Sequence, residues 1–278
     1  MTPDNATTSH WVHDLSPFLV QFTENIGIRY YGLAYLLGFA GGAWLLYLAA
    51  KSQRLKLPPV AVADLMTALI IGALLGGRLG YFLLYDLGSV LRNPLQLVQV
   101  WQGGMASHGG FVGVAVALIW FGRKHRISFW HLADAVVAVA PLGLALGRVA
   151  NFINGELWGR VSSVRWAVIF HDSAAPGTPL HEIAARHPSQ IYQAVLEGFL
   201  LLAFTQWRFW RTGAVAKSPG RLSGEFLVAY AVARSVGEIF REPDAGLIMG
   251  LSRGTFYSLF MVVIGLVIIR RSNAPIRA

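Results

Sequence analysis

The stretch Val62–Tyr85, which reads VADLMTALIIGALLGGRLGYFLLY, decides the fold class of this chain. Asp64 near its start and Arg78 in its second half are its only charged residues. A helix needs about 20 mostly apolar residues to cross the hydrocarbon core of a bilayer. The stretch therefore predicts a transmembrane helix that carries an intramembrane arginine.

The whole chain has the composition of a membrane protein. Of its 278 residues, 55% are hydrophobic and only 13% are charged, whereas a soluble domain carries about 25% charged residues. This composition excludes a water-soluble monomer and a disordered chain. The chain contains no cysteine, which excludes disulfides, thiolate metal sites and a cysteine nucleophile of its own.

Six further apolar stretches accompany Val62–Tyr85. The sequence therefore predicts an all-α polytopic membrane protein with about seven transmembrane helices. The third predicted helix is short, and we expect it to begin a little before His108. The seven predicted spans cover residues 30–50, 62–85, 108–121, 131–152, 191–210, 222–240 and 254–269.

Basic residues follow every second span. Because basic loops stay in the cytoplasm, this pattern places the N-terminus outside and the C-terminus inside. It also explains the net charge of +9 without a nucleic-acid partner. Thirteen of the 23 basic residues belong to this set: Lys51, Arg54, Lys56, Arg123, Lys124, Arg126, Arg208, Arg211, Lys217, Arg221, Arg270, Arg271 and Arg277.

The predicted spans divide the chain into five parts. Residues 153–190 form the only long connection and predict a small periplasmic head domain, with a strand-like piece at 165–170. Residues 11–22 are amphipathic enough to lie along the outer membrane surface. The parts are a periplasmic arm at 1–29, helices one to four at 30–152, the head domain, helices five to seven at 191–270, and a cytoplasmic tail at 271–278.

Ionisable residues within the spans are expensive and generally functional, at roughly 2.5 to 3.5 kcal/mol each at a helix centre. The predicted topology puts six of them at one depth near the outer leaflet, where they would line a polar cavity capped by the head domain. These are Arg78, His108, Arg148, Glu197, Arg234 and Glu238. One face of the sixth span also carries Tyr230 and Arg241.

Residues 147–160, which read GRVANFINGELWGR, are the most unusual stretch, because an apolar helix ends there in two Asn, a Gly and a Glu. Arg148 and Asn151 share a helix face at a spacing of three residues. We interpret Arg148 as functional. The alternative is a side chain that reaches the membrane interface and pairs with Glu156.

His108 lies between glycines in residues 103–110, GGMASHGG, which permits close approach of a substrate. It is either a general base or a helix cap. His187 is as consistent with a structural role as with a functional one. Tyr31 is either a substrate contact or a membrane anchor. The other histidines show no ligand spacing on a common helix, so no metal site is predicted.

The chain resembles the prolipoprotein diacylglyceryl transferases of bacterial inner membranes over about residues 29–269. Residues 147–159 resemble the signature of that family almost position by position. Three further stretches resemble its other motifs in order: Ser107-His108-Gly109-Gly110, His187-Pro188-Ser189-Gln190, and Arg234…Glu238…Arg241-Glu242-Pro243-Asp244.

The resemblance implies a transferase that needs no metal and no cofactor. A diacylglyceryl group would move from phosphatidylglycerol to the lipobox cysteine thiol of a preprolipoprotein, giving a thioether and glycerol phosphate. This is the first step of lipoprotein maturation. It implies a multi-pass protein of the inner membrane whose active site faces the periplasmic leaflet.

The implied chemistry assigns roles to the residues singled out above. His108 would remove the thiol proton, and Arg148 and Arg234 would bind the leaving phosphate. The expected substrate-binding residues are Tyr31, Arg78, Asn151, Asn154, Gly155, Glu156, Tyr230, Glu238 and Arg241.

Two other classes of protein would share this composition. A secondary transporter places its charges at the membrane midplane between internal repeats. A lipid-binding scaffold would need the basic cavity but no base such as His108.

Overall fold

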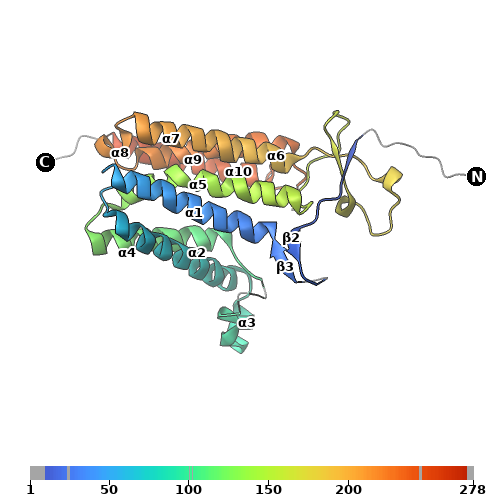
Figure 1. Ribbon diagram of the computed structural model, residues 1–278, viewed down its shortest axis with the longest axis horizontal. Coiled ribbons are helices and arrows are strands. Elements are labelled where there is room, and N and C mark those ends of the chain that lie inside the picture. The colour runs from blue at the N-terminus through green and yellow to red at the C-terminus, as the bar shows by residue number, and fades with distance from the viewer. Residues whose placement is uncertain (1–9, 24–25, 100, 102, 244–245, 274–278) are drawn as a thin grey trace, which may run out of the picture. The chain divides into compact units, whose positions relative to one another are not determined.

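The computed structural model describes residues 10–23, 26–99, 101, 103–243 and 246–273. Helices dominate these residues (Figure 1). Asp244 of the last sequence motif, Arg277 of the basic set, most of the tail at 271–278 and the first nine residues of the N-terminal arm lie outside the described residues.

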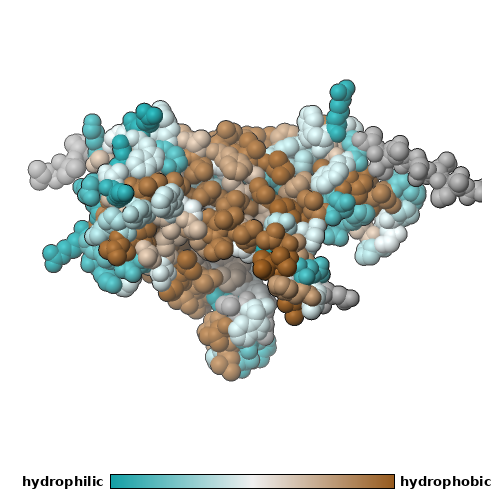
Figure 2. Space-filling view, viewed as in Figure 1, coloured by the Kyte–Doolittle hydropathy of each residue, from teal (hydrophilic) through white to brown (hydrophobic). Residues whose placement is uncertain are grey.

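Helices occur at all seven positions predicted as spans. They are α1 (Tyr30–Lys51), α2 (Val62–Tyr85), α4 (Ser107–His125), α5 (Phe129–Ile153), α6 (Ser189–Gln193) continued by the π-helix η6 (Ala194–Leu200) and α7 (Leu201–Arg211), α9 (Arg221–Phe240) and α10 (Arg253–Ser272). Among the described residues, four helices are long and apolar enough to cross a membrane: Tyr30–Lys51, Pro59–Tyr85, Phe129–Ile153 and Arg253–Ser272. Figure 2 shows apolar side chains gathered over the middle of the helices and hydrophilic ones towards their ends.

Short elements occupy the connections. The helical ones are η1 (Pro59–Ala61), α3 (Leu87–Arg92), η2 (Pro94–Leu97), η4 (His171–Ser173), η5 (Leu180–Glu182) and α8 (Ala214–Lys217), and the strands are β1 (Trp11–His13), β2 (Phe18–Gln21), β3 (Gly27–Arg29) and β4 (Val168–Phe170). The chain divides into two compact units, residues 43–136 and residues 1–42 with 137–278.

In the unit of residues 43–136, α2 packs on α4 through glycines. A Cβ atom at Gly80 would lie 2.6 Å from the Cα of Gly109, and one at Gly72 would lie 2.7 Å from the carbonyl oxygen of Gly113. Small residues allow this close approach, which favours helix association in lipid. Gly109 and Gly113, four residues apart on α4, form the small-residue face of this contact.

In the other unit, α9 packs against α7 and α10 (Figure 1). Residues 11–22 contain the strands β1 and β2, and their place along the membrane surface stays a prediction. β1 pairs in parallel with β4, and β2 pairs antiparallel with β3. The partner of β1 lies more than 150 residues away in the chain, so a local amphipathic pattern could not reveal it.

The connection between α5 and α6 is fastened at both ends. Its Gly159 amide donates to the carbonyl of His187 at 2.9 Å, and its Arg160 amide donates to the carbonyl of Phe240 at 2.9 Å. The strand-like piece predicted at 165–170 is present in part as β4. These bonds hold the start of the connection against the ends of two helices, which positions the candidate site.

Candidate active site

The C-terminal end of α5 brings three predicted substrate-binding residues together. Asn151 is buried, and its amide nitrogen donates to the Glu156 carboxylate at 2.7 Å and to the Tyr31 hydroxyl at 3.3 Å. The bond from the Glu156 amide to the Asn151 carbonyl, 3.1 Å long, closes the turn between them. The predicted headgroup contacts therefore form one polar cluster.

The turn that follows α5 has an unusual backbone. Gly155 has a φ of +68°, which favours glycine, and a Cβ atom there would lie 3.1 Å from the His13 ring. The side-chain amide of Gln190 donates to the backbone carbonyl of Glu156 at 2.6 Å, and the Ser189 hydroxyl donates to the backbone carbonyl of Leu157 at 3.1 Å. The start of α6 thus fixes this turn.

Asn154 has a buried side-chain oxygen with no hydrogen-bond partner among the described residues. Buried polar atoms are normally satisfied, so an unpaired one is a candidate contact for a bound molecule.

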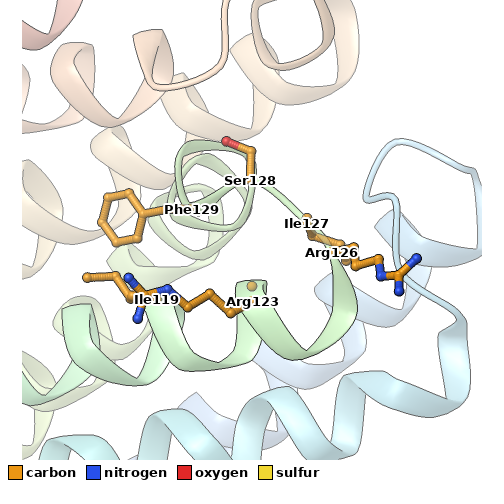
Figure 3. Close-up of a pocket in the computed structure, with 7 residues that line it drawn as sticks. Ile119, Arg123, Arg126, Ile127, Ser128 and Phe129 are labelled. Carbon is orange, nitrogen blue, oxygen red and sulfur yellow. The ribbon is translucent and has the colours of Figure 1, made fainter.

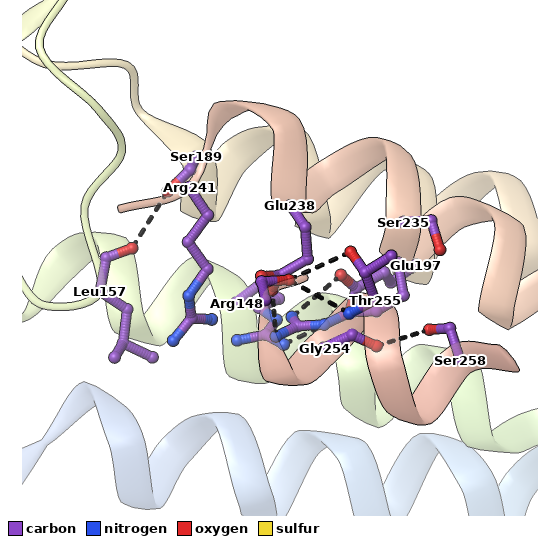
Figure 4. Close-up of polar contacts among 12 residues, drawn as sticks. Arg148, Leu157, Ser189, Glu197, Ser235, Glu238, Arg241, Gly254, Thr255 and Ser258 are labelled. Carbon is purple, nitrogen blue, oxygen red and sulfur yellow. Dashed lines mark hydrogen bonds and ion pairs between the residues drawn. The ribbon is translucent and has the colours of Figure 1, made fainter. Parts of the chain in front are cut away.

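Four charges from three helices form a network next to this cluster. Arg148 of α5 lies 3.2 Å from the Oε2 atom of Glu197. Arg234 of α9 lies 3.3 Å from its other carboxylate oxygen, Oε1. A second bond, 2.5 Å long, joins Arg234 to Glu238. Figure 4 shows Arg148, Glu197 and Glu238 gathered at this point. In the described residues, the ion-pair partner of Arg148 is Glu197 rather than Glu156.

Glu197 is the residue to which the sequence assigned no role in binding or catalysis. Its side chain has no exposed surface, whereas those of Arg148 and Arg234 keep 17% and 15% exposed. A buried carboxylate is stable only when it is paired. Glu197 therefore fixes both guanidinium groups, while both arginine side chains keep some exposed surface. Its position in an apolar span was the signal, but only the folded chain shows which cations it joins.

Two close contacts shape the network. Gly254 is the second residue of α10, and a Cβ atom there would lie 2.7 Å from the Glu238 carboxylate and 2.8 Å from Arg234 Nε. Tyr230, one turn before Arg234 on α9, interacts with Glu197. The sequence singled out Tyr230 but missed Gly254, because no local pattern shows that this glycine faces Arg234 and Glu238 of α9.

Arg241 follows the end of α9 and is buried. Its backbone pairs with Gly159, and its carbonyl accepts a hydrogen bond from Arg160 Nε at 3.1 Å. Gly159 fits only as glycine, because a Cβ atom would lie 2.5 Å from the carbonyl oxygens of His187 and Phe240.

His187 packs in a small aromatic group. Its ring lies 5.3 Å from that of Phe240, and its Nδ1 atom lies 3.2 Å from the Tyr192 hydroxyl. Burial lowers the pKa of His187 below its usual value, which favours the neutral ring.

Arg78 and His108 belong to the unit of residues 43–136, and the predicted cavity that combines them with the other four charges stays a prediction. His108 is exposed at the start of α4. It lines an apolar groove of about 800 Å³ between α2 and α4, together with Leu79, Leu83 and Gly109. The guanidinium of Arg78 donates to backbone carbonyls of residues 96–104.

A separate hollow of about 610 Å³ lies where α4 turns into α5 (Figure 3). Arg123, Arg126, Ser128 and Phe129 line it. These residues include none of the predicted site residues, so we do not assign the hollow to the reaction.

Comparison with known proteins gives one consistent result. A family profile described as prolipoprotein diacylglyceryl transferase matches residues 17–271. The chain is 44% identical over 257 residues to the phosphatidylglycerol–prolipoprotein diacylglyceryl transferase of Rhodospirillum centenum, with 91% of this chain and 90% of the relative covered. The proteins of the same name from Rhizobium meliloti (45% identity, 91% of each chain) and Ruegeria pomeroyi (42% identity, 94% and 96%) are similar too.

Proposed function

The chain belongs to the prolipoprotein diacylglyceryl transferase family, and from that membership we propose that it transfers diacylglycerol from phosphatidylglycerol to a preprolipoprotein. The lipobox cysteine sulfur forms a bond to the terminal glycerol carbon of the lipid. The bond from that carbon to the phosphate oxygen breaks, and the thiol loses its proton. The products are a thioether and glycerol phosphate.

The observation that carries the proposal is the pair of arginines joined by one buried carboxylate. The leaving group gains negative charge as the carbon–oxygen bond breaks, and arginine offers parallel hydrogen bonds to phosphate while staying charged in a dry site. Arg148 and Arg234 bind this phosphate. Glu197 and Glu238 hold the two side chains, since their contacts of 2.5 to 3.3 Å restrict the guanidinium groups.

The neighbouring polar cluster binds the rest of the headgroup. The Asn151, Tyr31 and Glu156 contacts present amide, hydroxyl and carboxylate groups in one place, which suits the hydroxyl groups of a glycerol. The other proposed substrate contacts are Asn154, Gly155, Tyr230, Glu238 and Arg241.

His108 is the proposed general base. A thiol has an ordinary pKa of about 8.5, so only a small fraction is thiolate at neutral pH. A base therefore assists the attack. Its place beside an apolar groove supports this role, because the reacting lipid needs apolar surface next to the base.

The proposed arrangement has seven transmembrane helices, a periplasmic arm at 1–29, a periplasmic head at 153–190 and a cytoplasmic tail at 271–278, in a bacterial inner membrane. The last turns of α1, α4, α7 and α10 all carry basic residues, which supports a common cytoplasmic side. The active site then faces the periplasmic leaflet.

The direct test uses the detergent-purified chain with phosphatidylglycerol and a peptide that contains a lipobox cysteine. We expect release of glycerol phosphate and a mass increase of the peptide by one diacylglyceryl group. A peptide with serine in place of the cysteine is the control and should release none. Lipid binding without release in the cysteine reaction would contradict a transferase.

A further inference from the structure

Arg78 is almost completely buried, with 4% of its surface exposed. It lies in the last third of α2, and the chain that follows this helix returns to the start of α4. Five backbone carbonyls from residues 96–104 of that return surround its guanidinium group.

These contacts use every donor of the arginine. Nε donates to the Leu97 carbonyl at 3.3 Å. Nη1 donates to the carbonyls of Gly103 and Gly104, and the bond to Gly104 is 3.1 Å long. Nη2 donates to the carbonyls of Gln96 and Gln99, and the bond to Gln99 is 2.8 Å long. An arginine has five N–H donors. The side chain also stacks on the Phe82 ring at 4.7 Å. A guanidinium engaged in this way keeps no N–H group for a lipid phosphate.

We call the contacts between Arg78 and the carbonyls of Gln96, Leu97, Gln99, Gly103 and Gly104 the clamp. The clamped residues come shortly before His108 in the chain. Gly104 has a φ of +79°, and a Cβ atom there would lie 2.8 Å from the Tyr81 ring and 3.0 Å from Arg78 Nη1. Two residues later, the Ala106 amide donates to the Gly77 carbonyl at 2.9 Å. The last third of α2 thus holds the chain up to Ser107, where α4 begins.

We propose that Arg78 is a positioning residue, which fixes the backbone at Gln96, Leu97, Gln99, Gly103 and Gly104 and so sets the place of His108 in the first turn of α4. The proposal rests on the role of His108 as the base. It gives Arg78 a different task from Arg148 and Arg234, since Arg78 acts through the backbone rather than on the lipid. Lysine can replace it only in part, because an ammonium group has three donors and no planar fork.

Kinetics of Arg78→Met and Arg78→Lys test the effect on the reaction. A displacement of about 1 Å at a reacting group costs roughly 10²-fold in rate. We therefore expect kcat for Arg78→Met to fall about 10²-fold, while KM for phosphatidylglycerol stays near the wild-type value. The activity of Arg78→Met should partly recover towards pH 9, because more of the substrate thiol is then ionised without help from a base. Arg78→Lys should lie between wild type and Arg78→Met.

A spin label tests the clamp itself without any dependence on activity. The chain has no cysteine, and Leu95 is 68% exposed, so Leu95→Cys provides a single accessible thiol beside the clamped carbonyls. The label should become more mobile when Arg78→Met is added. Arg92→Met is the matched control, since Arg92 is an exposed arginine of α3 in the same connection, and it should change neither mobility nor kcat.

The results separate the competing explanations. A raised KM for phosphatidylglycerol with an unchanged label would overturn the proposal and make Arg78 a direct lipid contact. If His108→Ala keeps the wild-type pH profile, the base assignment fails, while a mobilised label still supports the clamp. If the Arg78→Met variant cannot be purified, Arg78→Lys becomes the test. A wild-type kcat and a wild-type label mobility in Arg78→Lys would then overturn the proposal.

Discussion

At the scale of single residues, the site depends on one carboxylate that touches two guanidinium groups. Removing one member of a buried ion pair costs about 3 to 5 kcal/mol, because a charge is left without its partner. Here the loss of Glu197 would leave two arginines unbalanced, with Glu238 as the remaining anion of the network.

Glu197→Gln keeps the shape of the side chain and removes its charge. We expect glycerol phosphate release to fall at least about 10²-fold, because both proposed phosphate ligands, Arg148 and Arg234, lose their fixed positions. The melting temperature should fall as well. Glu182→Gln is the control, since the Glu182 side chain is 60% exposed and pairs with His181 at the surface. Equal activities of the two variants would contradict the bridging role.

His108→Ala and Arg234→Ala should differ in their response to pH. A general base contributes about 10² to 10⁴-fold, and a higher pH supplies thiolate without it. His108→Ala should therefore be slow at pH 7 and recover in part towards pH 9. Arg234→Ala should stay inactive over this range, because pH cannot replace a phosphate ligand. The measurement is a pH–rate profile with a lipobox peptide, and a wild-type profile for His108→Ala would refute the base.

At the scale of elements, α10 contacts the charged network through Gly254 in its first turn. Gly254→Ala would place a methyl group against the Glu238 carboxylate and Arg234 Nε. We expect reduced transfer with little change in helix content. Gly143→Ala in α5 is the matched control, because nothing lies within 4 Å of a Cβ atom there. A Gly254→Ala protein as active as Gly143→Ala would show that the contact can relax.

The sequence predicts helices far better than it predicts their contacts. All seven predicted helical positions are helical, because apolar length is a local property of the chain. The pairing of β1 with β4, and of Glu197 with two arginines, joins residues distant in sequence. Local pattern carries no information on such partners. Glu197 was therefore recognisable as one of the charged residues within the spans, while its two arginine partners were not.

At the scale of the whole molecule, the orientation in the membrane can be tested with introduced thiols, since the natural chain has none. A maleimide that does not cross membranes should label Thr178→Cys in intact spheroplasts, because residue 178 belongs to the proposed periplasmic head. Ser52→Cys, which follows α1, should react only after permeabilisation. The opposite pattern would reverse the orientation and move the site to the cytoplasmic leaflet.

The order of the charged residues along the chain has a consequence for biosynthesis. In the proposed seven-span arrangement, helices leave the ribosome one after another, and an unpaired charge opposes release into lipid. Arg148 emerges first, and the next span brings Glu197, which neutralises it. Arg234 then arrives on the same helix as Glu238, four residues apart, so that α9 carries its own counter-ion. At each stage of synthesis, therefore, at most one charged side chain of this network lacks an ion-pair partner within the membrane.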